Sequence, residues 1–117
     1  NPFQLILHEH LNFEPWWIAP PHHINYFTFK SLAKLLVKCG FSIVHQESTF
    51  PIDLFLLMGD NYIGNEEMGR KCHKKRMNFE KSMRLHGASD LLEGLYSDLA
   101  KRGVGREIVM YAKKLKN

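Results

Sequence analysis

Residues 107–112 have the sequence Glu107-Ile108-Val109-Met110-Tyr111-Ala112, which is nearly continuously apolar. Short runs of this kind are typical of a strand that is covered on both faces. The sequence therefore predicts a strand over residues 106–113. A second strand is predicted over residues 41–48, because Phe41-Ser42-Ile43-Val44-His45-Gln46-Glu47 alternates in polarity and contains β-branched side chains.

The helix predicted over residues 29–40 leads directly into the earlier strand. Thr28 can cap its first turn, and Gly40 supplies a left-handed residue that ends it. Its apolar face consists of Phe29, Leu32, Ala33 and Leu36, with Leu35 beside them. A helix, a glycine and a strand in succession are typical of an α/β unit.

The segment 1–28 is predicted to form a short helix followed by a long loop. The apolar run of the helix is broken at Pro15, and residues 15–23 contain further prolines, which lack the backbone donor that a helix needs. Trp16 and Trp17 place much aromatic surface in this loop. Such a surface indicates that the loop packs against the body of the protein.

Residues 65–103 are predicted to form two further helices. Asn65 caps the first, which extends to residue 86 and carries seven basic and three acidic side chains, a net +4 that equals the net charge of the chain. Ser89 is expected to cap the second, whose apolar positions are Leu91, Leu92, Leu95, Leu99 and Ala100. Residues 50–63 fit either a short buried helix or an extended segment, because so short an apolar run has no clear periodicity.

The composition is that of an ordinary globular domain. The 117 residues are 44% hydrophobic and 24% charged, which excludes collagen-like and intrinsically disordered classes. The 16 basic and 12 acidic side chains give a net charge of +4. No apolar run approaches the roughly 18 residues of a membrane span. Cys39 and Cys72 are the only cysteines, so we expect a reducing, cytoplasmic environment rather than a disulfide framework.

Two strands make an incomplete fold. An isolated two-stranded sheet is marginally stable in water, and the run 107–112 is typical of the interior of a wider sheet. Strands from upstream sequence, or strands from a second copy of the chain, would each complete the sheet. The chain starts at Asn1 without an initiator methionine, so we expect it to be a portion of a longer domain.

Several motifs follow one another along the chain in a characteristic order. They are Pro21-His22-His23-Ile24-Asn25-Tyr26-Phe27-Thr28, Ser31-Leu32, Leu35-Leu36, Gly40-Phe41, Phe50-Pro51-Ile52-Asp53-Leu54-Phe55-Leu56-Leu57-Met58-Gly59-Asp60 and Gly103-Val104-Gly105-Arg106-Glu107-Ile108-Val109-Met110-Tyr111-Ala112-Lys113. In this order and spacing, the chain resembles the C-terminal part of class I S-adenosylmethionine-dependent methyltransferases. The likeness extends over essentially the whole chain.

The resemblance implies an α/β fold, namely the C-terminal fragment of a Rossmann-like methyltransferase sheet with about two antiparallel strands and three to four helices. In the seven-stranded sheet of that family, residues 41–48 would be the sixth strand. Residues 106–113 would be the seventh, inserted antiparallel beside the fifth. The chain would be a single portion of a domain, divided into helical stub and loop (1–28), helix and strand (29–48), helical insertion (49–104) and final strand (105–117).

The implied function is to complete the sheet and the acceptor-substrate side of a methyltransferase. The family's glycine-rich cofactor loop and its ribose-binding acidic residue are absent from these 117 residues, and Gly103-x-Gly105 precedes a strand rather than opening a helix. We therefore expect the full-length protein to use S-adenosylmethionine. The isolated chain is expected neither to bind this cofactor nor to be active. The expected partner is the N-terminal half of the same domain, and exposed sheet edges would also permit a homo-oligomer.

The main candidates for a functional patch are His22, His23, Asn25 and Tyr26. The resemblance places this group beyond the carboxyl end of the fifth strand, where α/β sheets bind ligands. A neutral imidazole there could remove a proton from the methyl acceptor. Trp16 and Trp17 are candidates for an aromatic wall beside the acceptor. Alternatively, the first group caps the next helix and hydrogen-bonds the loop, and the tryptophans only anchor it.

Two other interpretations concern metal ions and polyanions. His8-Glu9-His10 lacks zinc-type spacing, and side chains two residues apart on a helix diverge, so no metal site is expected. The basic helix over residues 65–86 and an isoelectric point near 9.1 leave an alternative function, a small basic interaction module that binds nucleic acid or a protein partner. Nucleic acid is not the expected partner, because basic residues on a surface helix usually interact only with water.

Overall fold

The computed structural model describes residues 1–116, which form a mixed α/β domain of five helices and a two-stranded antiparallel sheet. In chain order the elements are α1 (Pro2–Leu11), α2 (Phe29–Lys38), β1 (Phe41–Ser48), α3 (Asp53–Leu57), α4 (Glu66–Leu85), α5 (Ser89–Lys101) and β2 (Ile108–Lys114). Both predicted strands are confirmed. The helix count exceeds the expected three to four because the ambiguous segment 50–63 contains α3, which at five residues is too short to show a period.

The two strands pair antiparallel along one edge of each. Phe41 lies opposite Lys114 and Ser48 lies opposite Ile108, with a bulge where the register shifts between Ile43 and His45. The extra residue of a bulge is left without a partner in the ladder. Beyond β2, the backbone N–H of Leu115 donates to the carbonyl of Gly40 over 2.8 Å, which ties the turn before β1 to the end of the chain.

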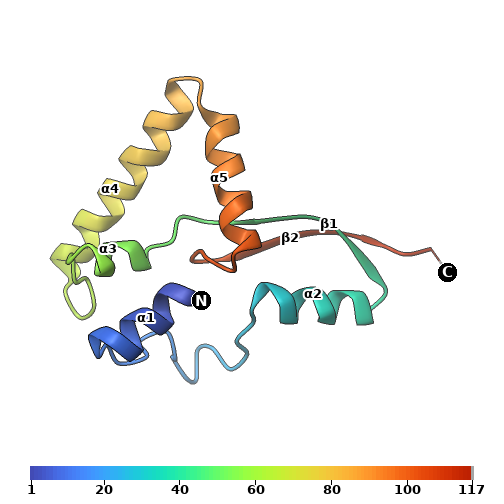
Figure 1. The fold of residues 1–117 in the computed structure, drawn as a ribbon, viewed down its shortest axis with the longest axis horizontal. Coiled ribbons are helices and arrows are strands. Elements are labelled where there is room, and N and C mark those ends of the chain that lie inside the picture. Colours follow the sequence, from blue (N-terminus) through green and yellow to red (C-terminus); the bar gives the residue numbers. More distant parts are fainter. Residues whose placement is uncertain (117) are drawn as a thin grey trace.

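Helices α4 and α5 form a hairpin in which α5 packs against β1. Figure 1 shows α2 on the opposite side of the β1–β2 ribbon. Hydroxyl groups join α5 to the end of β1. The Ser97 hydroxyl donates to the carbonyl of Gln46 over 3.4 Å, and the Ser48 hydroxyl donates to the carbonyl of Tyr96 over 3.3 Å. Ser48 is 2% exposed, so this contact lies inside the junction between helix and sheet.

The buried core lies mainly between α1, α3, α4 and α5. Its apolar members are Leu7, Phe55, Leu56, Cys72, Leu92, Tyr96, Ala100 and Val104. On α5 the buried residues are four positions apart, as a single helical face requires. The predicted apolar positions Leu91 and Leu95 lie outside this face, with Leu91 65% exposed. The predicted cap was also wrong, because Ser89 is the first residue of the helix and Ala88 precedes it without a side-chain cap.

Strand β2 is less covered than its sequence predicts. Its residues are half-buried or exposed, and Tyr111 is 53% exposed. Helix α2 likewise has no fully buried residue, and its apolar side chains Leu35 and Val37 are exposed. The expectation of a strand covered on both faces is therefore wrong for residues 1–116, because two strands and one helix on each side supply too little covering surface.

The side chain of Asn1 joins three segments that are distant in sequence. Its carbonyl oxygen caps α1 by accepting from the backbone of Gln4, and its amide nitrogen donates to Asp53 over 2.9 Å and to the carbonyl of Gly105 over 3.2 Å. Helices α1 and α3 and the turn before β2 are thereby held together. This junction forms one wall of the cleft described next.

Candidate functional site

A cleft of about 550 Å³ lies between the start of α1, the loop before α2, the first residues of α2 and the turn before β2. Its aromatic and apolar lining comes from Trp17, Ile18, Tyr26, Phe27 and Phe29, and Arg106 provides a cation. Ligand pockets in proteins usually have volumes of about 300–1,000 Å³ and largely apolar walls with a few polar groups. This cleft is the candidate site, and it is called the loop cleft below.

Aromatic contacts and one tyrosine hold the loop that forms the cleft. The rings of Trp16 and Trp17 are 4.8 Å apart and nearly perpendicular, and Phe13 packs against Trp16 at 5.9 Å. The Tyr26 hydroxyl accepts from the backbone N–H of Ala19 over 2.8 Å and donates to a carbonyl at 3.0 Å. The loop between α1 and α2 is therefore anchored mainly by its own side chains, and Trp17 also packs edge-on against His8 of α1 at 6.4 Å.

The structure brings two of the six predicted site residues into the loop cleft, Trp17 and Tyr26. The others do not line it. His22, His23 and Asn25 are exposed on the loop, and Trp16 contacts the neighbouring aromatic rings instead.

The alternative interpretation was that His22, His23, Asn25 and Tyr26 cap the next helix and form hydrogen bonds within the loop. Of this group, Tyr26 makes side-chain hydrogen bonds within the loop. The next helix is capped by Thr28, whose hydroxyl accepts from the backbone of Ser31 over 3.1 Å. Neither histidine takes part in that cap.

Arg106 occupies a central position that the sequence patterns did not single out. It is exposed, and it lines the loop cleft together with two adjacent hollows of about 340 and 220 Å³. Among residues 1–116, Arg106 forms no salt bridge and no carboxylate lines the loop cleft. The only sequence signal was its place after Gly103-x-Gly105.

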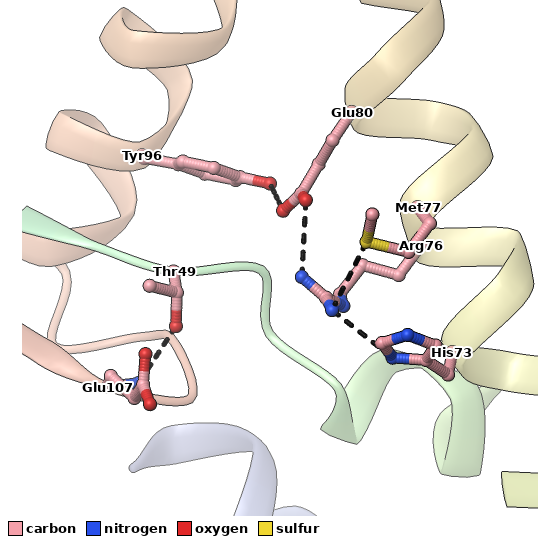
Figure 2. A network of polar contacts seen from close by, with 7 residues as sticks. All are labelled: Thr49, His73, Arg76, Met77, Glu80, Tyr96 and Glu107. Carbon is pink, nitrogen blue, oxygen red and sulfur yellow. Dashed lines mark hydrogen bonds and ion pairs between the residues drawn. The ribbon is translucent and has the colours of Figure 1, made fainter. Parts of the chain in front are cut away.

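The 340 Å³ hollow contains a polar network, which is shown in Figure 2. Glu80 is its centre, because it accepts from the Tyr96 hydroxyl over 2.7 Å and pairs with Arg76 over 3.1 Å. The second guanidinium nitrogen of Arg76 lies 3.2 Å from Nδ1 of His73. Burial and the hydrogen bond to Glu80 raise the pKa of Tyr96, so this tyrosine is a neutral donor.

The 220 Å³ hollow is lined by Tyr62, Phe55 and Cys72 among others. The Tyr62 hydroxyl is buried without a hydrogen-bond partner among the described residues, and burial raises the pKa of Tyr62 to about 12. Burial also raises the pKa of the Cys72 thiol, which keeps it protonated and therefore a weak nucleophile. These groups contribute packing rather than reactive chemistry.

The basic surface of α4 is partly neutralised by neighbouring carboxylates. Four of its cations form ion pairs, namely Arg70 with Glu66, Lys71 with Glu67, Lys75 with Asp60 and Arg76 with Glu80. Binding of a polyanion depends on cations that are available to its phosphates. The pairs therefore weaken the structural basis for a nucleic-acid surface on this helix.

Neither a metal centre nor a membrane span emerges from the described part of the chain. Residues 1–116 contain no group of three or more histidine, cysteine, aspartate or glutamate side chains that could hold a metal ion. No helix in that range is both long enough and apolar enough to cross a membrane.

Comparisons with protein-family models, curated proteins and solved structures find no match to this chain. The mixed α/β fold and the geometry of the loop cleft are therefore the observations that support a function. The cleft combines an aromatic wall, the guanidinium of Arg106 and an edge formed by the turn that leads into β2.

Proposed function

We propose that this chain is the C-terminal part of a class I S-adenosylmethionine-dependent methyltransferase, in which it completes the sheet and the acceptor-substrate side. The observation that supports the proposal is the bare two-stranded sheet. Each strand is hydrogen-bonded along one edge only, although β2 has the nearly continuous apolar sequence of an interior strand.

The exposed surfaces lie where further strands would be expected. A two-stranded sheet is marginal without additional packing, and Tyr111 on β2 is half-exposed. Helix α2, which precedes β1, also leaves Leu35 and Val37 exposed. An upstream strand that pairs with the free edge of β2 would complete the ladder and extend the sheet beneath the helices.

In the proposed enzyme the loop cleft forms the acceptor side. Methyl transfer depends mainly on holding the acceptor atom in line with the methyl group, so shaped walls contribute directly to the rate. Trp17 and Tyr26 supply rigid aromatic walls. His22 and His23 lie outside the cleft, so the proposal assigns the chain a positioning role and no catalytic base.

The residues of this chain do not fit S-adenosylmethionine as resident cofactor. The cofactor loop of Rossmann-like folds follows a strand and opens a helix, so that backbone amides at the helix start face the ligand. Here Gly103 and Gly105 lie between α5 and β2, in the reverse order. The proposal therefore assigns the cofactor to upstream sequence, and no step is derived through it.

Isothermal titration with S-adenosylmethionine tests the proposal on two proteins, the 117-residue chain and the same chain extended by the sequence encoded upstream. We expect binding by the extended protein and none by the shorter one. The matched control is the extended protein with its upstream glycine-rich loop replaced by alanines. Tight binding by the shorter chain alone would contradict the proposal, as would an extended protein that does not bind.

Assembly provides a second, independent test. Bare sheet edges favour edge-to-edge pairing between copies, so the shorter chain should form dimers or larger species in sedimentation velocity. The extended protein should form smaller assemblies, because its additional strands would cover the free edge of the sheet. A shorter chain that stays monomeric over a wide concentration range would count against a missing strand.

The alternative function, a small basic interaction module, has a different test. Binding to mixed DNA or RNA at low salt should fall steeply as the salt concentration rises if phosphates bind α4. The ion pairs along α4 predict little retention even at low salt. Strong, salt-sensitive retention would favour the interaction module over the methyltransferase fragment.

A further inference from the structure

We propose that the loop cleft binds a small molecule that carries an apolar ring and one anionic group, with Arg106 binding the anion. The assignment of this molecule as methyl acceptor rests on the proposed function. Binding itself rests only on the described residues. The inference therefore names the chemical class of ligand that the cleft accepts.

The apolar part of the ligand follows from the walls of the cleft. Trp17, Tyr26 and Phe27 contribute aromatic surface, and Ile18 adds an aliphatic side chain. Aromatic walls favour flat, apolar groups through burial and offset or edge-to-face ring contacts. Trp17 is positioned by Trp16, whose ring lies 4.8 Å away, so this wall is formed before a ligand arrives.

The anionic part of the ligand follows from the charge of the lining. Arg106 is the charged side chain that lines the cleft, and no acidic side chain among residues 1–116 lines it. A guanidinium group presents a planar fork of donors that fits a carboxylate or a phosphate in a bidentate manner. An anion in the cleft therefore meets the guanidinium of Arg106 and no acidic side chain of the described residues.

Of the four carboxylates that line the 340 Å³ hollow with Arg106, Glu47 and Glu80 are engaged elsewhere, and Glu93 and Glu107 make no ion pair with Arg106 in the described chain. Glu80 accepts from Tyr96 and pairs with Arg76, and Glu47 accepts from the Tyr111 hydroxyl over 3.2 Å. Arg106 forms no salt bridge within the described chain. Its guanidinium therefore remains available to a ligand in the cleft.

The side chains of Tyr26, Thr28 and Asn1 in the cleft already form hydrogen bonds within the protein. The Tyr26 hydroxyl bonds the loop backbone on both sides, and the Thr28 hydroxyl caps α2. Asn1 binds Asp53 and Gly105. Arg106 is therefore the side chain that we expect to contribute most to recognition of the anionic end of a ligand.

The experiment uses a matched pair of probes, 1-naphthaleneacetate and its neutral analogue 1-naphthaleneethanol. Each is titrated into the ¹⁵N-labelled chain, and amide chemical shifts report both position and affinity. We expect the acetate to shift the amides of Phe27, Thr28 and Arg106, and to bind about fivefold more tightly than the alcohol, as a charge-assisted contact at a partly solvated site should.

Three variants separate the charge of Arg106 from its effect on the fold. R106Q should bring the affinity for the acetate down to that for the alcohol, whereas R106K should keep part of the preference because it keeps the charge. R70Q is the control, because Arg70 is an exposed arginine on α4 that lines neither the loop cleft nor the two adjacent hollows and loses the same charge. It should leave both affinities unchanged.

Equal affinity of the two probes for the unmodified chain would overturn the proposal, as would equal effects of R106Q and R70Q. Shifts confined to the C-terminal half of α2 or to the α4–α5 hairpin would also overturn it, because the probe would then bind another apolar surface. These results do not involve S-adenosylmethionine. Failure here would leave the methyltransferase proposal standing, and failure of cofactor binding by the extended protein would leave this inference standing.

Discussion

Replacing Gly105 with alanine should destabilise the fold far more than the same replacement at Gly103. Both glycines have positive φ, +141° at Gly105 and +70° at Gly103. A Cβ at Gly103 meets no atom within 4 Å. A Cβ at Gly105 would overlap the Cβ of Ser48 and would lie 2.5 Å from its hydroxyl oxygen and 2.9 Å from the carbonyl oxygen of Thr49.

The magnitudes follow from these two environments. G103A introduces backbone strain alone, which costs about 1 kcal/mol for a left-handed residue that gains a Cβ. G105A adds strain of about 1–3 kcal/mol and overpacking of about 1–3 kcal/mol, for a total near 4 kcal/mol. The overpacking cannot relax easily, because Ser48 is 2% exposed and its hydroxyl is bonded to the carbonyl of Tyr96.

Urea unfolding followed by tryptophan fluorescence measures the difference. With a slope of about 1.5 kcal/mol per molar urea, the G105A midpoint should lie about 2 M below that of G103A. Midpoints of the two variants within about 0.5 M of each other would refute the reasoning, since they would show that Ser48 moves aside at little cost.

Three other predictions concern buried polar groups. Y96F removes the 2.7 Å bond to Glu80 and should lower the free energy of unfolding by about 1–2 kcal/mol, whereas Y62F removes a hydroxyl without a partner and should cost less than about 0.5 kcal/mol. Equal urea midpoints for the two variants would contradict this contrast. Burial raises the pKa of Asp53 above its usual value of 3.8, so the native state binds the proton more tightly than the unfolded state. Stability should therefore fall as pH rises above that value, and D53N should remove this slope in urea midpoints measured across pH; parallel curves for the two proteins would exclude Asp53 as the cause.

Local signals in the sequence were sufficient to predict where several helices and strands begin or end. Thr28 and Asn65 accept from the backbone of the first helical turns, as capping residues do. Strand β1 has the predicted bounds. Strand β2 starts two residues later than predicted, because Gly105 holds the preceding turn at positive φ.

Burial was harder to predict because it depends on partners that local sequence does not specify. On α5, leucines occur on more than one face, so apolar spacing alone could not choose between Leu91 and Leu92. Contact with the end of β1 decides in favour of the face that contains Tyr96. A run of apolar residues in β2 predicted a covered strand, but covering requires neighbouring strands that residues 1–116 do not contain.

Only part of the candidate site was predicted, because the other part depends on tertiary contacts that local sequence does not specify. Aromatic residues in a proline-rich loop indicated a packed surface, and Trp17 and Tyr26 do line the cleft. Arg106 was missed because it lies near the other end of the chain, and only the tertiary fold brings it to the loop. The imidazoles of His22 and His23 have the chemistry of a general base, but that chemistry does not determine whether a side chain faces a cleft or solvent.

The link between α5 and β1 has a consequence for the order of folding. Ser48 and Ile108 pair in the sheet although the whole α3–α5 segment separates them, so direct pairing must close a long loop. Once Ser97 is docked on Gln46, only the last turn of α5 and the turn after it separate that contact from Ile108. After docking has closed the 51-residue separation between Ser97 and Gln46, the shorter loop lowers the entropic cost of the second closure by about 1.5 kcal/mol. We therefore expect the transition state for folding to contain the helical hairpin docked on β1, with β2 joining afterwards.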